Sequence, residues 1–165
     1  MTYTKEYEVF IGKNADKIIS QFKKIDARSK KKFAWTPPVW NIIFFGPIWY
    51  FYRKMYVYGI ILTLLPFIAS FLEELLGFRL PSSVFIGLNI GYAFIGFSAY
   101  RTHVVKSVAK ILQTTKNKAE IDDKLRAKGG VAVGVTALVI MLYILIIGFV
   151  VYSVMQNGVV AQEIQ

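Results

Sequence analysis

The sequence predicts an all-α membrane protein with three transmembrane helices, plus an N-terminal amphipathic helix and a kinked aromatic helix that is re-entrant or interfacial. Two observations predict this class. Hydrophobic residues make up 55% of the 165 residues and the mean hydropathy is +0.47, which exceeds the usual apolar share of a soluble domain, about 45–50%. These residues are also gathered into long uncharged blocks, and hydrocarbon is the solvent that suits such blocks.

Residues 1–32 form a basic N-terminal segment with an amphipathic helix over about 14–29. Ala15, Ile18, Phe22 and Ile25 recur at helical spacing and share one face. Two positions remain open for this face: packing against the protein itself, or lying in the lipid headgroup region. The first residues are charged and no apolar run follows them, so we expect no cleavable signal peptide.

Residues 33–54 are predicted to form an aromatic helix that does not cross the membrane. The continuous apolar run, 39–52, is about 21 Å long as a helix, against a hydrocarbon core of about 30 Å. Gly46 and Pro47 interrupt this run, because proline removes an amide donor and crowds the preceding turn, so we predict a helix kink there.

Aromatic and basic side chains around this helix are typical of the membrane interface. Trp and Tyr settle at the headgroup boundary, and cations there attract anionic lipid. The predicted interface or lipid-headgroup anchors are Trp35, Trp40, Trp49, Tyr52, Arg53, Lys54 and Tyr56. For Arg53 and Lys54 a specific headgroup site or a partner site is the alternative to ordinary anchoring.

Residues 55–152 are predicted to form a three-span membrane domain, with spans over 55–72, 82–100 and 131–152. The loop 101–130 between the second and third spans is basic, and its first part, 101–112, is predicted to continue the second helix as an amphipathic segment. Residues 153–165 form the remaining tail. We expect this tail on the external side of the membrane.

The distribution of charge predicts the topology. If residues 33–54 crossed the bilayer, the 20 Lys and Arg residues would divide 10 to each side. If they do not cross, 19 of the 20 fall on the side of the N-terminus and Arg79 alone lies opposite. Only the second arrangement obeys the positive-inside rule, so we predict a cytoplasmic N-terminus and an external, periplasmic C-terminus.

Catalytic, metal and cofactor sites are not predicted. The chain has no cysteine and one histidine, and no Asp, Glu, Lys, Arg or His lies within a predicted span. His103 follows the second span and is interpreted as structural or solvated, because no carboxylate or serine stands near it at a catalytic spacing. We therefore expect no enzymatic activity, no small-molecule substrate and no cofactor. The net charge of +10 is explained by topology rather than by nucleic-acid binding.

The second span carries a candidate helix-packing or partner face made of Gly87, Asn89 and Gly91. Glycines four residues apart allow close helix approach, and an amide in hydrocarbon seeks a hydrogen-bond partner. The partner can be another span of this chain or a second protein.

One segment resembles a known family. Residues 33–56, preceded by residues 10–19, are similar to the signature of a bacterial family of small membrane proteins that is catalogued only as a domain of unknown function. The most specific matching residues are Phe45, Gly46, Pro47, Trp49, Tyr52, Arg53, Lys54, Met55 and Tyr56. The resemblance implies a protein of the bacterial cytoplasmic (inner) membrane and supplies no activity. Some relatives carry an N-terminal zinc ribbon, and this role does not transfer to a chain without cysteine.

These observations lead to three hypotheses. The first is a non-enzymatic accessory or scaffold subunit of a larger membrane complex, or a homo-oligomer, whose partners are other membrane subunits or itself. The second is a membrane-organising protein that binds anionic lipids through its amphipathic stretches 14–29 and 101–112. The third is a channel or transporter subunit, in which case Asn89 is the residue to test.

Overall fold

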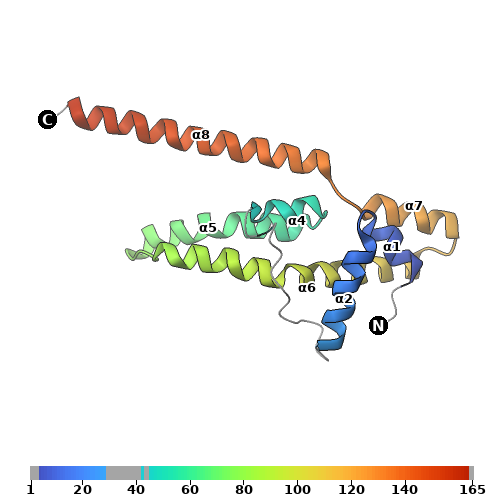
Figure 1. Ribbon diagram of the computed structural model, residues 1–165. Coiled ribbons are helices and arrows are strands. Elements are labelled where there is room, and N and C mark those ends of the chain that lie inside the picture. The colour runs from blue at the N-terminus through green and yellow to red at the C-terminus, as the bar shows by residue number, and fades with distance from the viewer. Residues whose placement is uncertain (1–3, 29–41, 43–44, 164–165) are drawn as a thin grey trace. The chain divides into compact units, whose positions relative to one another are not determined.

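The computed structural model describes residues 4–28, 42 and 45–163, and its assigned elements are all helices. In chain order they are α1 (Lys5–Ile11), α2 (Ala15–Arg28), α4 (Ile48–Tyr52), α5 (Tyr56–Leu76), α6 (Ser82–Thr114), α7 (Lys118–Lys128) and α8 (Val133–Glu163) (Figure 1). The chain divides into two compact units, residues 1–132 and residues 133–165, and the second unit is α8 with the end of the chain. Trp35 and Trp40, two of the predicted anchors, lie outside the described residues.

Three of the described helices are long and apolar enough to cross a membrane, namely α5, α6 and α8. The predicted fold class, all-helical with three such helices, is confirmed at this level. The spans differ from the prediction at their ends. Helix α5 continues to Leu76, and α8 covers Val133–Glu163. Helix α6 runs without a break through Tyr100 to Thr114, as predicted for residues 101–112, so that one 33-residue helix has an apolar first part and a polar second part.

Polar segments from distant parts of the sequence form a helical bundle. This basic bundle consists of α1, α2, residues 101–114 of α6, and α7, which contact one another (Figure 1). Its centre is apolar: Phe10, Phe22, Val104, Val108 and Leu125 are each no more than 2% exposed. Burial of a side chain of this size stabilises a fold by roughly 1.5–3 kcal/mol, so this core is the main support of the bundle.

The apolar face predicted for residues 14–29 lies in that core. Ile18, Phe22 and Ile25 of α2 are between 0% and 5% exposed. Val104 and Val108, from the predicted amphipathic stretch 101–112, are also buried. The sequence left two alternatives for the N-terminal amphipathic helix, and the structure has the first: the helix packs on its own protein.

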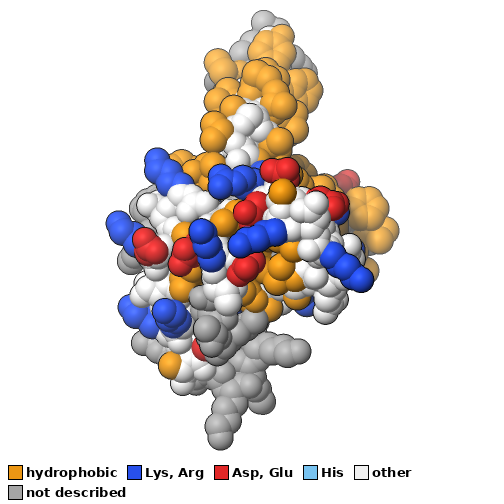
Figure 2. Space-filling view, turned by 90° about the vertical axis from the view of Figure 1, so that its right-hand side faces the viewer, with side chains coloured by type: hydrophobic (Ala, Val, Ile, Leu, Met, Phe, Trp, Pro, Cys, Tyr) orange, Lys and Arg blue, Asp and Glu red, His pale blue; other side chains and the backbone are white. Residues whose placement is uncertain are grey.

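The surface of the basic bundle carries charges of both signs. Figure 2 views the molecule from the right-hand side of Figure 1 and shows Lys and Arg side chains interspersed with Asp and Glu. One ion pair is largely shielded from solvent: Arg101 of α6 contacts Asp26 of α2 at 2.5 Å, with side chains 12% and 18% exposed. This pair joins α2 to α6 one residue beyond the predicted end of the second span.

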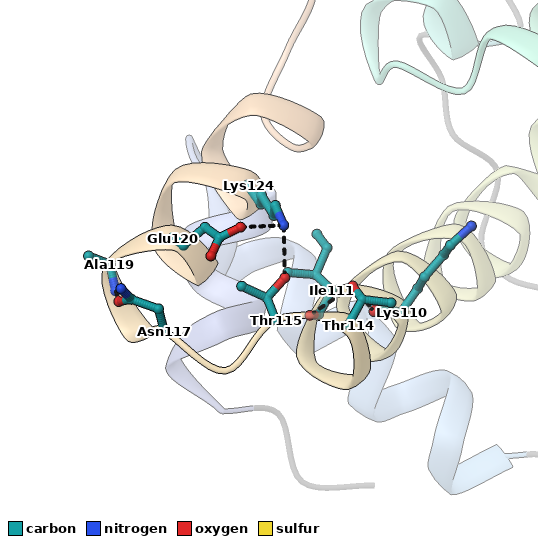
Figure 3. Close-up of polar contacts among 8 residues, drawn as sticks. All are labelled: Lys110, Ile111, Thr114, Thr115, Asn117, Ala119, Glu120 and Lys124. Carbon is teal, nitrogen blue, oxygen red and sulfur yellow. Dashed lines mark hydrogen bonds and ion pairs between the residues drawn. The ribbon is translucent and has the colours of Figure 1, made fainter.

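The corner between α6 and α7 is closed by side-chain hydrogen bonds (Figure 3). The Asn117 side chain caps α7 by accepting a hydrogen bond from the backbone N–H of Ala119 at 3.0 Å. Lys124 donates to the hydroxyl of Thr115 at 3.0 Å and pairs with Glu120 at 2.7 Å. The bond from Lys124 to Thr115 joins α7 to the end of α6, and the other two stabilise the first turns of α7.

The closest approach between α1 and the end of α7 occurs at Gly129. A Cβ atom added to this residue would collide with the carbonyl oxygen of Phe10. The next residue, Gly130, donates its backbone N–H to the same oxygen at 2.7 Å. Residue 129 therefore has to be glycine for the two helices to meet at this distance.

We expect Gly129→Ala to lower the free energy of unfolding by about 1–3 kcal/mol, because the added methyl group collides with backbone rather than with a movable side chain. Thermal unfolding of the full chain in detergent, followed by circular dichroism, measures the effect. The matched control is Gly148→Ala, whose Cβ would meet nothing within 4 Å. Equal unfolding temperatures for the two variants would contradict the assigned contact.

Candidate functional site

The candidate site lies where α4 and the turn after it meet α6. The approach to α4 is a break in the helix rather than a bend. The N–H of Gly46 donates to the carbonyl of Ile42 at 2.7 Å, and Gly46 then takes φ +52°, a left-handed conformation that ends a helix. Pro47 follows with φ −62°, which suits the start of the next helix. The kink predicted at Gly46 and Pro47 is thus a complete interruption.

Aromatic side chains of α4 pack against the last turns of the apolar part of α6. The Trp49 ring centroid lies 6.4 Å from that of Phe97 and 5.8 Å from that of Tyr100, both in edge-on geometry. Tyr50 is 1% exposed, and its hydroxyl donates to the carbonyl of Tyr92 at 3.0 Å. Trp49 was predicted to face lipid headgroups, but it is only 8% exposed because α6 covers it.

Tyr100 and Arg53 form the centre of this site. The guanidinium carbon of Arg53 lies 5.3 Å from the ring centroid of Tyr100 and 5.6 Å from that of Tyr52, within cation–π range of both. The Tyr100 ring also contacts Phe22 of α2 edge-on at 5.8 Å. One ring therefore joins α2, α4 and the turn that carries Arg53 to helix α6.

Polar atoms at this centre are buried without hydrogen bonds. Nε and Nη1 of Arg53 and the hydroxyl of Tyr100 have no hydrogen-bond partner among the described residues. The rings therefore hold the guanidinium by their faces instead of by a carboxylate.

Lys54 points away from Arg53, although the sequence groups the two as one pair of anchors. Lys54 has φ +57°, rare for a residue with a side chain, and its ammonium donates to the carbonyl of Ala127 at 2.8 Å. Nearby, the N–H of Ala132 donates to the carbonyl of Tyr52 at 2.9 Å. The turn between α4 and α5 is thereby bonded to the end of α7 and to the segment after it.

A cavity of about 340 Å³ lies beside Lys54. Its lining residues are Lys54, Tyr56, His103, Ser107, Ala127 and Lys128. His103 lies beyond the apolar part of α6, and burial lowers its pKa because the charged imidazolium loses hydration. From its sequence context His103 is expected to be structural or solvated, and no motif in the sequence singles out Ser107 or Lys128. Ser107 stands four residues after His103, so helical spacing could have paired these two, whereas Lys128 comes from another helix.

The predicted packing face of Gly87, Asn89 and Gly91 is divided by the structure. A Cβ on Gly87 or Gly91 would meet nothing within 4 Å, whereas the Asn89 side-chain oxygen lies 3.4 Å from the Cβ position of Gly46. The Asn89 amide nitrogen donates to the carbonyl of Phe85 in its own helix at 3.0 Å. Residues two positions apart point about 200° apart around a helix, so Asn89 cannot share a face with the two glycines.

The described residues contain no group of three or more His, Asp or Glu side chains placed to hold a metal ion.

At the turn between α5 and α6, a carboxylate oxygen of Glu73 accepts a hydrogen bond from the N–H of Leu80 at 2.9 Å, so this acidic side chain closes the turn.

Comparison with known protein families finds a match over most of the first two thirds of the chain. The model of a family described as "Protein of unknown function (DUF2628)" matches residues 10–109. No curated protein and no solved structure matches the chain. The matched range begins in α1 and ends in the polar part of α6, so it includes Arg53, Tyr100 and His103.

We expect Tyr100→Leu to lower the free energy of unfolding by about 1–3 kcal/mol, because it removes the ring that contacts Phe22, Trp49 and the Arg53 guanidinium. Tyr100→Phe is the matched control and should stay within about 0.5 kcal/mol, since it keeps the ring and removes a hydroxyl without a hydrogen bond in the described structure. Tryptophan fluorescence during thermal unfolding measures both. Equal losses for Phe and Leu would assign the role to the hydroxyl instead.

Proposed function

The chain belongs to the DUF2628 family, whose description assigns no function, and we propose that it is a non-enzymatic accessory or scaffold subunit of a larger membrane complex or of a homo-oligomer. The observation that carries the proposal is a contrast in packing within one unit. The basic bundle has a closed apolar core, whereas in the 21-residue helix α5 only Gly59 is buried. A protein built in this way presents membrane helices to its surroundings and fixes them to a well-packed polar body.

The exposed membrane helices supply the surfaces for association. Phe67 and Phe71 of α5 are 59% and 65% exposed, and Ile86 of α6 is 61% exposed. Lipid chains are as apolar as these side chains, so helices in a bilayer associate through close packing at small residues rather than through the hydrophobic effect. Gly87 and Gly91, four residues apart and open, form such a position on α6.

The proposed topology has the basic bundle in the cytoplasm, at the inner membrane of a bacterium, and the C-terminus outside. Three contacts support this arrangement. Helices α1 and α2 pack on residues 101–114, and Lys54 reaches Ala127. The N-terminal segment, the start of α5 and the loop after α6 therefore lie on one side of the membrane. The proposal keeps the expectation that residues 33–54 are re-entrant or interfacial and do not cross the membrane; of these, residues 33–41, 43 and 44 lie outside the described residues.

The alternative, a membrane-organising protein that binds anionic lipids through its amphipathic stretches, receives less support. It requires the apolar faces of 14–29 and 101–112 to lie in the lipid headgroup region, but Phe22, Val104 and Val108 of these stretches are each 0% exposed. The bundle would have to open to release them, at a cost of several kcal/mol.

The test is the mass of the full chain after gentle extraction from native membranes. We expect a particle larger than the 18.8 kDa chain, containing either several copies or a second protein in fixed ratio. Gly87→Leu combined with Gly91→Leu should reduce this association at least tenfold, because bulky side chains there keep a partner helix at a distance.

Gly148→Leu is the matched control. It makes the same change in α8 at another glycine with nothing within 4 Å, and it should leave the particle unchanged. A strictly monomeric wild-type particle with no co-purifying protein would refute the proposed role.

A further inference from the structure

The cavity beside Lys54 gathers basic side chains from three separate elements. Lys54 comes from the turn between α4 and α5, His103 from α6 and Lys128 from the end of α7. Tyr56 and Ser107 add hydroxyl groups, and no carboxylate is among the lining residues. The volume of about 340 Å³ is within the range of small-ligand sites, about 300–1,000 Å³.

Lys54 is held in place before any ligand arrives. Its backbone occupies the left-handed region at φ +57°, and its ammonium donates to the carbonyl of Ala127 at 2.8 Å. An ammonium group has three donors, so two remain after this bond. This bond restricts the side chain, so part of the side-chain entropy cost of binding an anion is met before the anion arrives.

No acidic residue is among the described residues that line the cavity with His103. These residues are Lys54, Tyr56, Ser107, Ala127 and Lys128. On the side of α1, His103 meets the ring of Phe10, with ring centroids 6.2 Å apart. None of these groups stabilises a protonated imidazole, whereas a bound anion would do so and would raise the pKa of His103.

We propose that this cavity binds a phosphate group. The ammonium groups of Lys54 and Lys128 neutralise its charge, and the hydroxyls of Ser107 and Tyr56 donate hydrogen bonds to its oxygens. The cavity borders Tyr56, the first residue of the first membrane helix, so both a lipid headgroup and a free phosphate can supply this chemistry. The proposal does not depend on the accessory role proposed above.

The single histidine makes the site directly observable. We would label the imidazole of His103 in the full-length protein and follow its titration by NMR in maltoside micelles and phosphate-free buffer. Three additions are compared: inorganic phosphate at constant ionic strength, phosphatidylglycerol, and a galactolipid that contains no phosphate. A bound phosphate should raise the pKa of His103 by about one unit, and the galactolipid should leave it unchanged.

Charge-matched variants assign the effect to the cavity. Lys54→Gln and Lys128→Gln should each raise the Kd for the active addition about tenfold, whereas Lys110→Gln, an equal charge change outside the cavity, should not. Lys54→Arg keeps the charge and therefore distinguishes a loss of binding from a loss of folding. Circular dichroism checks the fold of each variant.

The source of the phosphate follows from which additions act. A response to both inorganic phosphate and phosphatidylglycerol supports the shared chemistry, a response to phosphatidylglycerol alone assigns a lipid headgroup, and a response to inorganic phosphate alone assigns a free phosphate. No response to either overturns the proposal. An equal loss of binding in Lys110→Gln also overturns it. In either case the role left to Lys54 and Lys128 is to cap the end of α7.

Discussion

The contact of the Tyr100 ring with Phe22, Trp49 and Arg53 is the interaction on which the described arrangement depends. Tyr100 stands where the apolar part of α6 becomes polar, and it is 1% exposed. Phe22 belongs to the basic bundle and Trp49 to α4, which precedes the apolar helix α5. A single ring thus connects the basic bundle to α4 and to the apolar part of α6.

The same region explains why α4 is short. Gly46 ends one helical turn and Pro47 starts the next, which frees the chain to turn Trp49 and Tyr50 toward α6. Close packing then continues into α5, where a Cβ on Gly59 would lie 2.8 Å from the ring of Phe51. Trp49, Tyr50 and Phe51 therefore serve packing between helices.

The turn after α4 separates two adjacent cations into different roles. Arg53 is held between aromatic faces, while Lys54 reaches the end of α7 and borders the cavity with His103 and Lys128. A scaffold role and a phosphate site are compatible in this arrangement, because the exposed faces of the membrane helices and the cavity are formed by different side chains.

The all-helical class and the three long apolar helices could be predicted from the amino-acid sequence, because long uncharged blocks have only one suitable solvent. A kink at Gly46 and Pro47 could be predicted because backbone chemistry there is local, and the structure has a full break at this point. The contacts made by the side chains of the site could not be predicted. Trp49 is buried against α6, Asn89 lies beside Gly46, and Lys54 lines a cavity with His103 and Lys128. Such partners lie far apart in the chain, and periodicity along one helix cannot reveal which other helix covers it.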